Sequence, residues 1–183
     1  MKLLKTDIAG LFVAETTAYQ DHRGAFARLY CEQELAPAIH GRQIVQVNHS
    51  RTAAIGAVRG MHYQVTPHAE MKLVRCLRGR VWDVAVDLRK DSPTFLHWHA
   101  EELSQENARM MILPEGCAHG FQVLEADSEL LYLHTAFYTP ASEAGLAHDD
   151  PMLAIAWPLP VTDLSERDRK HPLLTPIFSG ITL

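Results

Sequence analysis

The sequence lacks the features of membrane and secreted proteins. No hydrophobic run approaches the roughly 20 residues that span a bilayer, and charged side chains interrupt Met1–Asp7 too early for a secretory signal. The 3 cysteines, Cys31, Cys76 and Cys117, are odd in number and widely spaced. That spacing predicts free thiols in a reducing compartment rather than disulfides or a metal cluster. We therefore expect a cytoplasmic protein that does not contact a membrane.

Positive charge is also scarce overall, since the 183 residues carry a net charge of −5. Nucleic-acid-binding proteins are usually basic, so this balance argues against a nucleic-acid partner. The cations nevertheless cluster in one third of the chain: Arg51, Arg59, Lys72, Arg75, Arg78 and Arg80. We expect the side chains of Arg78 and Arg80 to be solvated at strand edges. Arg59 and Lys72 flank His62 and favour a site for an anion.

Repeats, low-complexity tracts and linkers are absent, and short strand-like runs dominate. Turn signals separate these runs, as in a β-sandwich or small barrel. We predict strands at Leu11–Thr17, Ala25–Tyr30, Ile44–Ser50, Lys72–Leu77, Val81–Leu88, Thr94–Ala100, Arg109–Leu113, Gly120–Leu124 and Leu130–Thr135. We also predict a hairpin around Gly79 whose second arm is half-buried, with Asp83 and Asp87 on the polar face. A short helix is expected at Glu32–Ile39.

The length fits one domain over residues 1–183. The proline-rich segment from about residue 160 is expected to pack over the body, and Leu164–Asp168 is expected to form a capped turn.

The segment Val58–Gln64 reads as a strand but contains an arginine and a histidine, two residues that can take part in binding or catalysis. Arg59 and His62 are 3 residues apart and would point to opposite faces of an ideal strand. Gly60 between them permits a bulge that turns both toward one cavity. An imidazole exchanges protons near neutral pH and a guanidinium binds phosphate. A buried, hydrogen-bonded histidine is the structural alternative.

Proton abstraction needs a base, an acid and a donor that stabilises an oxyanion. His62 fits the base, Lys72 the donor and Tyr132 the acid. A tyrosine packed in the core is the alternative for Tyr132. His119, which follows Pro114-Glu115-Gly116 at the start of a strand, fits a ligand-facing position or a histidine bonded within the turn.

His97-Trp98-His99 is a weaker pattern. Histidines at i and i+2 share one face of a strand and can hold a metal. A third ligand of suitable spacing and a glycine-rich lead-in are absent. We expect solvent-facing histidines and no metal.

Together these motifs resemble the dTDP-4-dehydrorhamnose 3,5-epimerase family. The resemblance runs in order from about Asp21 to Leu174. It is carried by Asp21–Phe26, Gln46–Ser50, Val58–Gln64, Lys72–Arg75, Val81–Arg89, Asp91–Phe95, Pro114–Phe121, Asp150-Pro151, Trp157-Pro158 and Leu164–Asp168.

The resemblance implies a mainly β, cupin-type jelly roll with a few short helices. It also implies a homodimer that works without metal or cofactor. The implied substrate is a nucleotide-linked 4-keto-6-deoxyhexose, inverted at C3 and C5 through an enolate.

The resemblance also implies roles for particular residues. His62 matches the base, Asp168 the acid that orients it, Tyr132 the donor on the opposite face, and Lys72 the cation near the C4 oxygen. Residues that match substrate-contacting positions are Arg23, Phe26, Gln46, Asn48, Arg59, His119, Glu143 and Arg167.

Four positions depart from the family pattern, namely Arg28, Val47, Leu133 and His148. Arg28 stands where an acidic residue is usual, and Leu133 where a lysine often follows the tyrosine. None belongs to the acid–base pair, so their expected effect is on substrate identity or on the number of centres inverted.

Three alternatives remain. The first is an epimerase that inverts only C3 or only C5 of a related sugar nucleotide. The second is a metal-dependent cupin enzyme that uses His97, His99 and His119. The third is a sugar-binding barrel without turnover, which would not require His62, Lys72, Tyr132 and Asp168 together.

Overall fold

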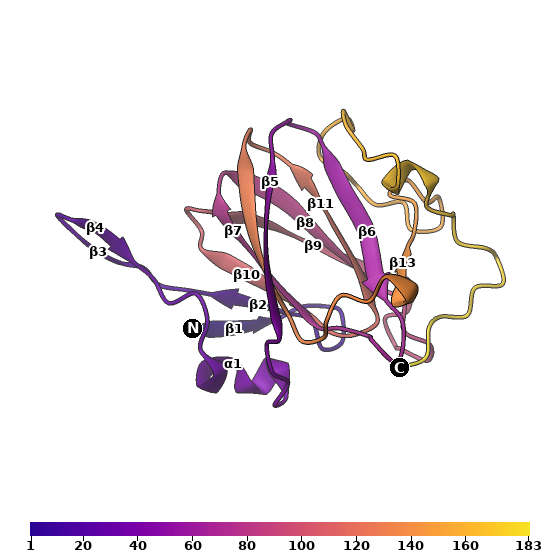
Figure 1. The fold of residues 1–183 in the computed structure, drawn as a ribbon, viewed down its shortest axis with the longest axis horizontal. Helices are drawn as coiled ribbons and strands as arrows, with labels where there is room; N and C mark the ends of the chain where they lie inside the picture. Colours follow the sequence, from indigo (N-terminus) through magenta and orange to yellow (C-terminus); the bar gives the residue numbers. More distant parts are fainter.

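The computed structural model describes residues 1–183 and is built mainly of antiparallel strands. One sheet has 6 strands, in the order β1 (Lys2–Lys5), β2 (Phe12–Glu15), β10 (Arg109–Leu113), β7 (Lys72–Arg78), β12 (Ser128–His134) and β5 (Gln46–Thr52). The other has 5 strands, in the order β13 (Glu143–Gly145), β6 (Val58–Gln64), β11 (Cys117–Val123), β8 (Arg80–Asp87) and β9 (Trp98–Ser104). Figure 1 shows the two sheets facing each other. This arrangement confirms the predicted jelly roll.

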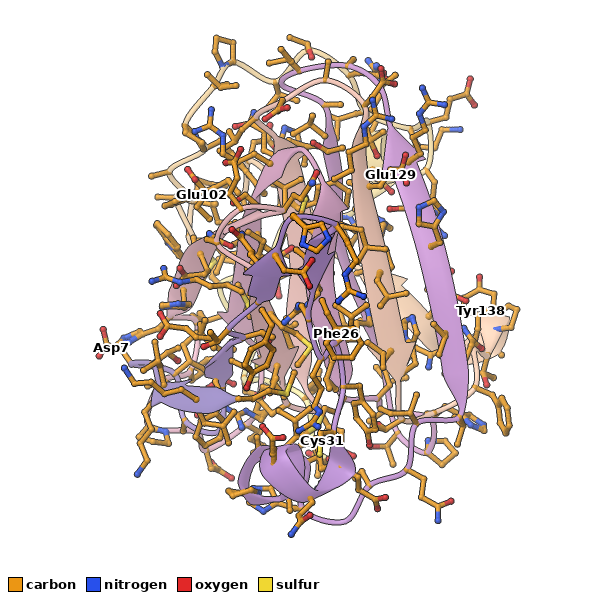
Figure 2. All side chains as sticks on the ribbon, turned by 90° about the vertical axis from the view of Figure 1, so that its left-hand side faces the viewer. Asp7, Phe26, Cys31, Glu102, Glu129 and Tyr138 are labelled. Atoms are coloured by element: carbon orange, nitrogen blue, oxygen red, sulfur yellow. The ribbon has the colours of Figure 1, made fainter.

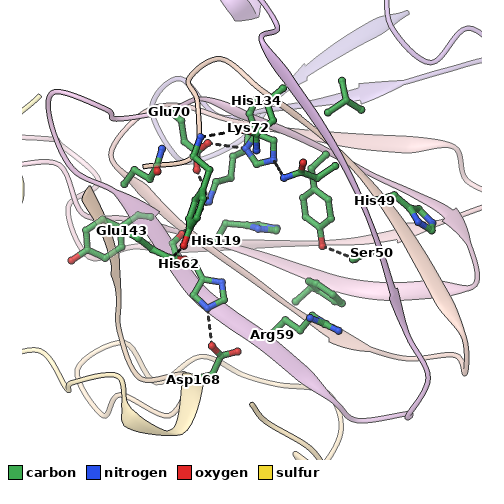
Figure 3. A pocket seen from close by; sticks show the side chains of 18 of the residues that line it. His49, Ser50, Arg59, His62, Glu70, Lys72, His119, His134, Glu143 and Asp168 are labelled. Carbon is green, nitrogen blue, oxygen red and sulfur yellow. Dashed lines mark hydrogen bonds and ion pairs between the residues drawn. The ribbon is translucent and has the colours of Figure 1, made fainter. Parts of the chain in front are cut away.

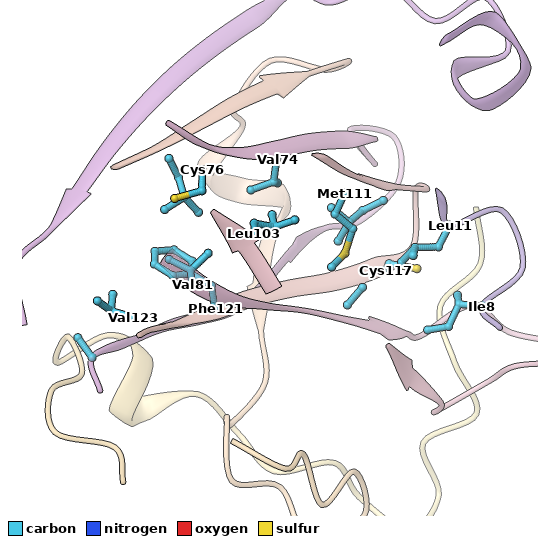
Figure 4. Packing of buried hydrophobic residues seen from close by; sticks show 14 residues of the cluster. Ile8, Leu11, Val74, Cys76, Val81, Leu103, Met111, Cys117, Phe121 and Val123 are labelled. Carbon is cyan, nitrogen blue, oxygen red and sulfur yellow. The ribbon is translucent and has the colours of Figure 1, made fainter. Parts of the chain in front are cut away.

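A core between the two sheets holds them together. Its side chains come from the inward faces of strands in both sheets, as Figure 4 shows. Its members include Val74, Val81, Leu103, Met111 and Phe121, each no more than 2% exposed. Burial of each such side chain stabilises the fold by about 1.5–3 kcal/mol, so this cluster fixes the spacing of the sheets.

Strand β8 is buried on both faces, which corrects the prediction of a half-buried strand. Asp83 and Asp87 are each 0% exposed. Val81 and Ala85 on the Asp83 face belong to the core between the sheets. The opposite face packs against a later segment of the chain, with contacts from Leu146, Leu153, Ile155, Trp157, Leu174, Phe178 and Ile181. Alternation of polar and apolar residues was misleading because both aspartates are buried with polar partners, Asp83 with His119 and Asp87 with Arg89, Ser92 and Thr94.

Helix α1 (Glu32–Ile39) has the predicted bounds and covers the outer face of the six-stranded sheet. Leu35, Ala38 and Ile39 pack there against residues that include Leu133. Leu133 therefore points away from the barrel interior, since neighbouring residues on a strand alternate between faces.

Some predicted boundaries were wrong. The expected strand Thr94–Ala100 begins only at Trp98, because Thr94 to Leu96 form turns that are bonded to the buried carboxylate of Asp87. The expected strand Ala25–Tyr30 contains only the end of β4 (Gly24–Phe26). The predicted hairpin around Gly79 is wrong, although the chain does turn there, with a φ of +74° at that glycine. Strand β7 pairs with β10 and β12 in one sheet, while β8 pairs with β9 and β11 in the other, so the turn carries the chain from sheet to sheet.

A two-stranded arm projects from the body. It consists of β3 (Tyr19–Asp21) and β4, and Figure 1 shows it extending from the left side. Tyr19 is 75% and Phe26 73% exposed. Figure 2 looks from the side of the arm and shows Phe26 in front of the body. Two large aromatic rings are thus held in solvent, which is costly unless something covers them.

The last part of the chain packs on the outside of the five-stranded sheet. It contains the short 3-10 helices η1 (Pro140–Ser142) and η2 (Asp168–Lys170). The amide of Asp168 donates a hydrogen bond to the Ser165 hydroxyl, at 3.0 Å, which confirms the expected capped turn. No helix of the structure is long and apolar enough to cross a membrane.

Candidate active site

One cavity of about 770 Å³ opens between the ends of β5, β6 and β12. Its polar lining is unusually rich in titratable groups. Of the 12 residues predicted to act in catalysis or substrate binding, 10 line it: Gln46, Asn48, Arg59, His62, Lys72, His119, Tyr132, Glu143, Arg167 and Asp168. Residues from six strands and from the segment around η2 therefore meet at one place (Figure 3).

The bulge predicted in Val58–Gln64 is present. His62 pairs with His119 and Arg59 with Phe121, so β6 carries one more residue than β11 between these pairs. Gly60 has a φ of +119°, and a Cβ there would lie 2.6 Å from the Gly120 Cα. Only glycine fits this close approach. As a result Arg59 and His62 both face the cavity.

His62 is paired with Asp168. Its Nε2 lies 2.8 Å from Asp168 Oδ1, and the other carboxylate oxygen accepts a hydrogen bond from the Gly60 amide at 3.2 Å. Burial would raise the pKa of Asp168, but the hydrogen bond and charge of His62 outweigh burial and hold this pKa well below its usual range. An ionised Asp168 can only accept, so Nε2 carries the proton. The lone pair on His62 Nδ1 is then free to act as a base.

Tyr132 stands on the neighbouring sheet. Its phenol forms a 3.1 Å hydrogen bond with Ser50, and its ring lies between those of His119 and His134, each with a centroid distance of 6.2 Å. Burial raises the pKa of Tyr132, which outweighs the opposing hydrogen bond from Ser50. The phenol therefore keeps its proton at neutral and moderately alkaline pH, as a proton donor must.

Lys72 belongs to a buried charged network. Its Nζ lies 3.0 Å from Glu70 Oε1, while Glu70 Oε2 lies 2.7 Å from His134 Nδ1. Asn48 Nδ2 is 3.3 Å from His134 Nε2. An amide nitrogen donates, so His134 accepts at Nε2 and donates from Nδ1 to Glu70. Burial would raise the pKa of Glu70, but the His134 hydrogen bond and the Lys72 charge lower it overall. The network holds the Lys72 ammonium inside the cavity.

Replacement of Glu70 by glutamine tests this network. The side chains of Glu70 and Lys72 are 7% and 11% exposed. Loss of one partner leaves a buried cation, so we expect Glu70→Gln to lower the free energy of unfolding by about 3 kcal/mol. Urea titration measures this loss. The matched control is Asp127→Asn, which breaks the exposed pair with Arg51 and should cost less than about 1 kcal/mol. Equal losses in both variants would show that the Glu70 network does not contribute specially to stability.

A second polar group lies at the rim. Arg167 Nη1 is 2.9 Å from Glu143 Oε1, and the Tyr138 hydroxyl donates to Glu143 Oε2 at 2.7 Å. The Tyr138 amide donates to Gln46 Oε1 at 3.1 Å. Arg167 Nη2 also approaches His62 Nε2 at 3.1 Å. The rim therefore offers a guanidinium, an amide and a phenol to a polar ligand.

The cavity floor contains a buried pair. His119 Nε2 lies 2.8 Å from Asp83 Oδ1, and the side chains are 7% and 0% exposed. Burial raises the pKa of Asp83, although the His119 charge opposes the shift. Asp83 thus orients a histidine that faces the cavity.

Arg23 and Phe26 are the two predicted substrate-binding residues that do not line this cavity. Both lie on the projecting arm, where Arg23 pairs with Asp21 at 2.6 Å. Within one chain the structure does not bring them to His62.

The positions that depart from the family pattern have different surroundings. Val47 lines the cavity and is 57% exposed. Leu133 packs under α1, and Arg28 pairs with Glu34 at the start of that helix. His148 is outside the cavity lining, and its carbonyl accepts a hydrogen bond from Trp157. Only Val47 can touch a ligand in the cavity directly.

Sequence reasoning missed several residues of the site. Ser50, Glu70, Asp83 and His134 bond to the predicted residues Tyr132, Lys72, His119 and Asn48, respectively. Asp83 gave no signal in the sequence, because its strand was predicted to be half-buried with the aspartates on the polar face. His97 and His99 do not share a strand face, because β9 begins at Trp98.

A jelly roll that holds a histidine–aspartate pair and a protonated tyrosine in one polar cavity defines a cupin-type acid–base enzyme. The model of the family described as dTDP-4-dehydrorhamnose 3,5-epimerase matches residues 5–176. This chain belongs to that family and is an isomerase of the epimerase class.

Individual relatives agree with this assignment. The dTDP-4-dehydrorhamnose 3,5-epimerase of Pseudomonas aeruginosa is 45% identical over 172 residues, which are 93% of this chain and 94% of the relative. The structure of the 3,5-epimerase RmlC from Legionella pneumophila in complex with dTDP-4-keto-L-rhamnose has a TM-score of 0.90, with 40% identity, and covers 96% of this chain and 94% of its own. ChmJ, a 3'-monoepimerase from Streptomyces bikiniensis in complex with dTDP-quinovose, has a TM-score of 0.85, with 34% identity, and covers 92% and 85%.

Proposed function

We propose that this chain converts dTDP-4-dehydro-6-deoxyglucose to dTDP-4-dehydrorhamnose by inverting C3 and C5. The observation that carries the proposal is the placement of the His62–Asp168 pair and the Tyr132 phenol on two facing sheets of one cavity. The Pseudomonas and Legionella relatives are named 3,5-epimerases, and each is more similar in sequence to this chain than ChmJ is. Both facts support inversion at C3 and at C5.

The mechanism follows from the side chains. The C4 ketone of the substrate acidifies the hydrogens on C3 and C5. His62 Nδ1 removes one of them, and Asp168 stabilises the imidazolium that forms. Lys72 stabilises the negative charge on the C4 oxygen of the enolate. Tyr132 returns a proton to the opposite face of the carbon, which inverts it. Arg59 and Arg167 bind the diphosphate, while Gln46, Asn48, His119 and Glu143 contact the sugar or nucleotide.

A turnover assay with dTDP-4-keto-6-deoxyglucose tests this proposal. We expect proton NMR of the product to show both C3 and C5 inverted, and the rate to persist in excess chelator. A product inverted at one centre alone would support the monoepimerase alternative, for which the likeness to ChmJ is the specific observation. Loss of turnover in chelator would support a metal-dependent cupin enzyme instead.

We also propose a cytoplasmic homodimer in which each arm reaches the cavity of the other chain. The arm of one chain carries Arg23 and Phe26 away from its own cavity, and its Tyr19 and Phe26 rings are exposed. A second copy would bury these rings and add a cation and a stacking surface to a nucleotide site. Each chain is proposed to be a single domain over residues 1–183.

Mixed dimers test the exchange of arms. A variant with Arg23→Ala and Phe26→Ala, and a variant with His62→Ala, should each have little activity. After the two are unfolded and refolded together, statistical pairing should restore roughly a quarter of the wild-type activity, because one cavity of each mixed dimer has an intact base and an intact arm. If the arm served its own chain, mixing would restore nothing.

A further inference from the structure

We propose that His62, Asp168 and His171 form a binding site for a divalent transition metal of the zinc class, and that metal bound there blocks the enzyme. The blocking effect rests on the proposed function, because His62 is its base. The metal is an inhibitor in this proposal and takes no part in turnover.

His171 is built into the catalytic pair. It follows η2, and its ring occupies the space over Gly145, where a Cβ would collide with the imidazole. Gly145 is the strand partner of His62. The rings of His62 and His171 meet edge to face, with a centroid distance of 5.4 Å and an interplanar angle of 74°. The fold therefore holds a second imidazole against the proposed base.

The potential ligand atoms converge on one point. Asp168 Oδ1 lies 2.8 Å from His62 Nε2 and 3.6 Å from His171 Nε2, and the ligand atoms of the three residues all lie within 4.8 Å of one another. Two imidazole nitrogens and one carboxylate oxygen form a ligand set that zinc accepts, with a fourth position left for water. Only small movements are needed to bring these atoms to metal-bonding distance.

His171 Nε2 is a buried nitrogen without a hydrogen-bond partner. Its 3.6 Å separation from Asp168 Oδ1 is too long for a hydrogen bond. Burial, followed by the charge of His62, lowers the pKa of His171, so the ring is neutral at neutral pH. A neutral imidazole that lacks a partner is available as a metal ligand, and unsatisfied buried polar atoms are rare without a reason.

Neighbouring charges favour and oppose the site. Asp168 supplies a negative charge that is 3% exposed. Arg167 opposes a metal, since its Nη2 lies 3.1 Å from His62 Nε2. The Arg167 side chain is 55% exposed and bonded to Glu143, so it can turn toward solvent.

A metal bound to His62 Nε2 would displace the proton that Nε2 now donates in its hydrogen bond to Asp168. The metal would also withdraw electron density from the ring, which makes Nδ1 a weaker base. Occupation of the site therefore stops proton abstraction and releases a proton to solvent.

Calorimetric titration of the chelator-treated protein with zinc chloride tests the site. We expect one zinc ion per chain, visible absorption bands of tetrahedral geometry when cobalt replaces zinc, and inhibition of turnover that chelator reverses. His171→Ala should bind zinc at least about tenfold more weakly, since one ligand is lost. His171→Phe keeps a ring over Gly145 but has no nitrogen ligand. Weaker zinc binding in this variant as well would show that the loss comes from the missing ligand and not from a loss of the fold.

The matched control is His97→Ala, which removes an exposed histidine elsewhere and should bind zinc as the wild type does. Equal zinc affinity in the wild type and both His171 variants would overturn the proposal, as would zinc binding that leaves turnover unchanged. Failure of the wild type to epimerise the sugar would count against the proposed function, while the calorimetry would still decide the metal site.

Discussion

His62→Ala is expected to lower kcat by about 10²–10⁴-fold, because general base catalysis contributes a factor of this size. The fold should survive, since His62 lies at a cavity and is not part of the three apolar clusters. Asp168→Asn should also lower kcat, because an amide can stabilise the tautomer that has no lone pair on Nδ1.

Steady-state kinetics with both variants measures these losses. His97→Ala, at an exposed position outside the cavity, is the matched control and should retain wild-type kcat. A His62→Ala enzyme with wild-type kcat would show that another group removes the proton.

Tyr132→Phe is expected to separate proton removal from inversion. The base side of the cavity stays intact in this variant, so His62 can still remove a proton from the substrate and return one to the same face. In deuterated water we therefore expect label in the substrate with retained configuration, while inversion falls by about 10²–10⁴-fold. Tyr30→Phe, outside the cavity, should behave as the wild type.

The raised pKa of Tyr132 adds a pH dependence. A group with a raised pKa keeps its proton up to that higher pH, so loss of the Tyr132 proton should not limit kcat below about pH 10, the usual phenol value. If Tyr132→Phe inverted the sugar at the wild-type rate, the proton donor would have to be a different group.

Much of the fold could be predicted from local patterns. Glu32–Ile39 was predicted with its observed bounds, and the two strands joined by a turn at Gly79 followed from two strand-like runs beside a glycine. Their pairing as a hairpin was wrong, because each strand pairs within a different sheet. The burial of β8 could not be predicted in this way. Its two faces contact different surroundings, the core between the sheets and the C-terminal segment, and neither contact is local in sequence.

The candidate site was predictable to a similar degree. Residue patterns indicated Arg59, His62, Lys72, His119 and Tyr132. The resemblance gave Asp168 and the other predicted lining residues. Glu70 and His134 were missed because the two are 64 residues apart and only strand pairing joins them. His171 follows η2 and carries no local signal, since its position depends on the space left by Gly145.

Arg23 and Phe26 show a different limit. The sequence resemblance assigned them to substrate contacts, yet one chain holds them on an arm outside its own cavity. In the homodimer that we propose, these residues reach the cavity of the second chain, a geometry that one chain does not contain.

The most direct test of the central claim, that His62 and Tyr132 exchange protons on opposite faces of the sugar, is NMR of wild-type turnover in deuterated water. Our account predicts deuterium at both C3 and C5 of the product, each with inverted configuration, and no label at either carbon with His62→Ala. A product that forms without solvent deuterium at these carbons would contradict it.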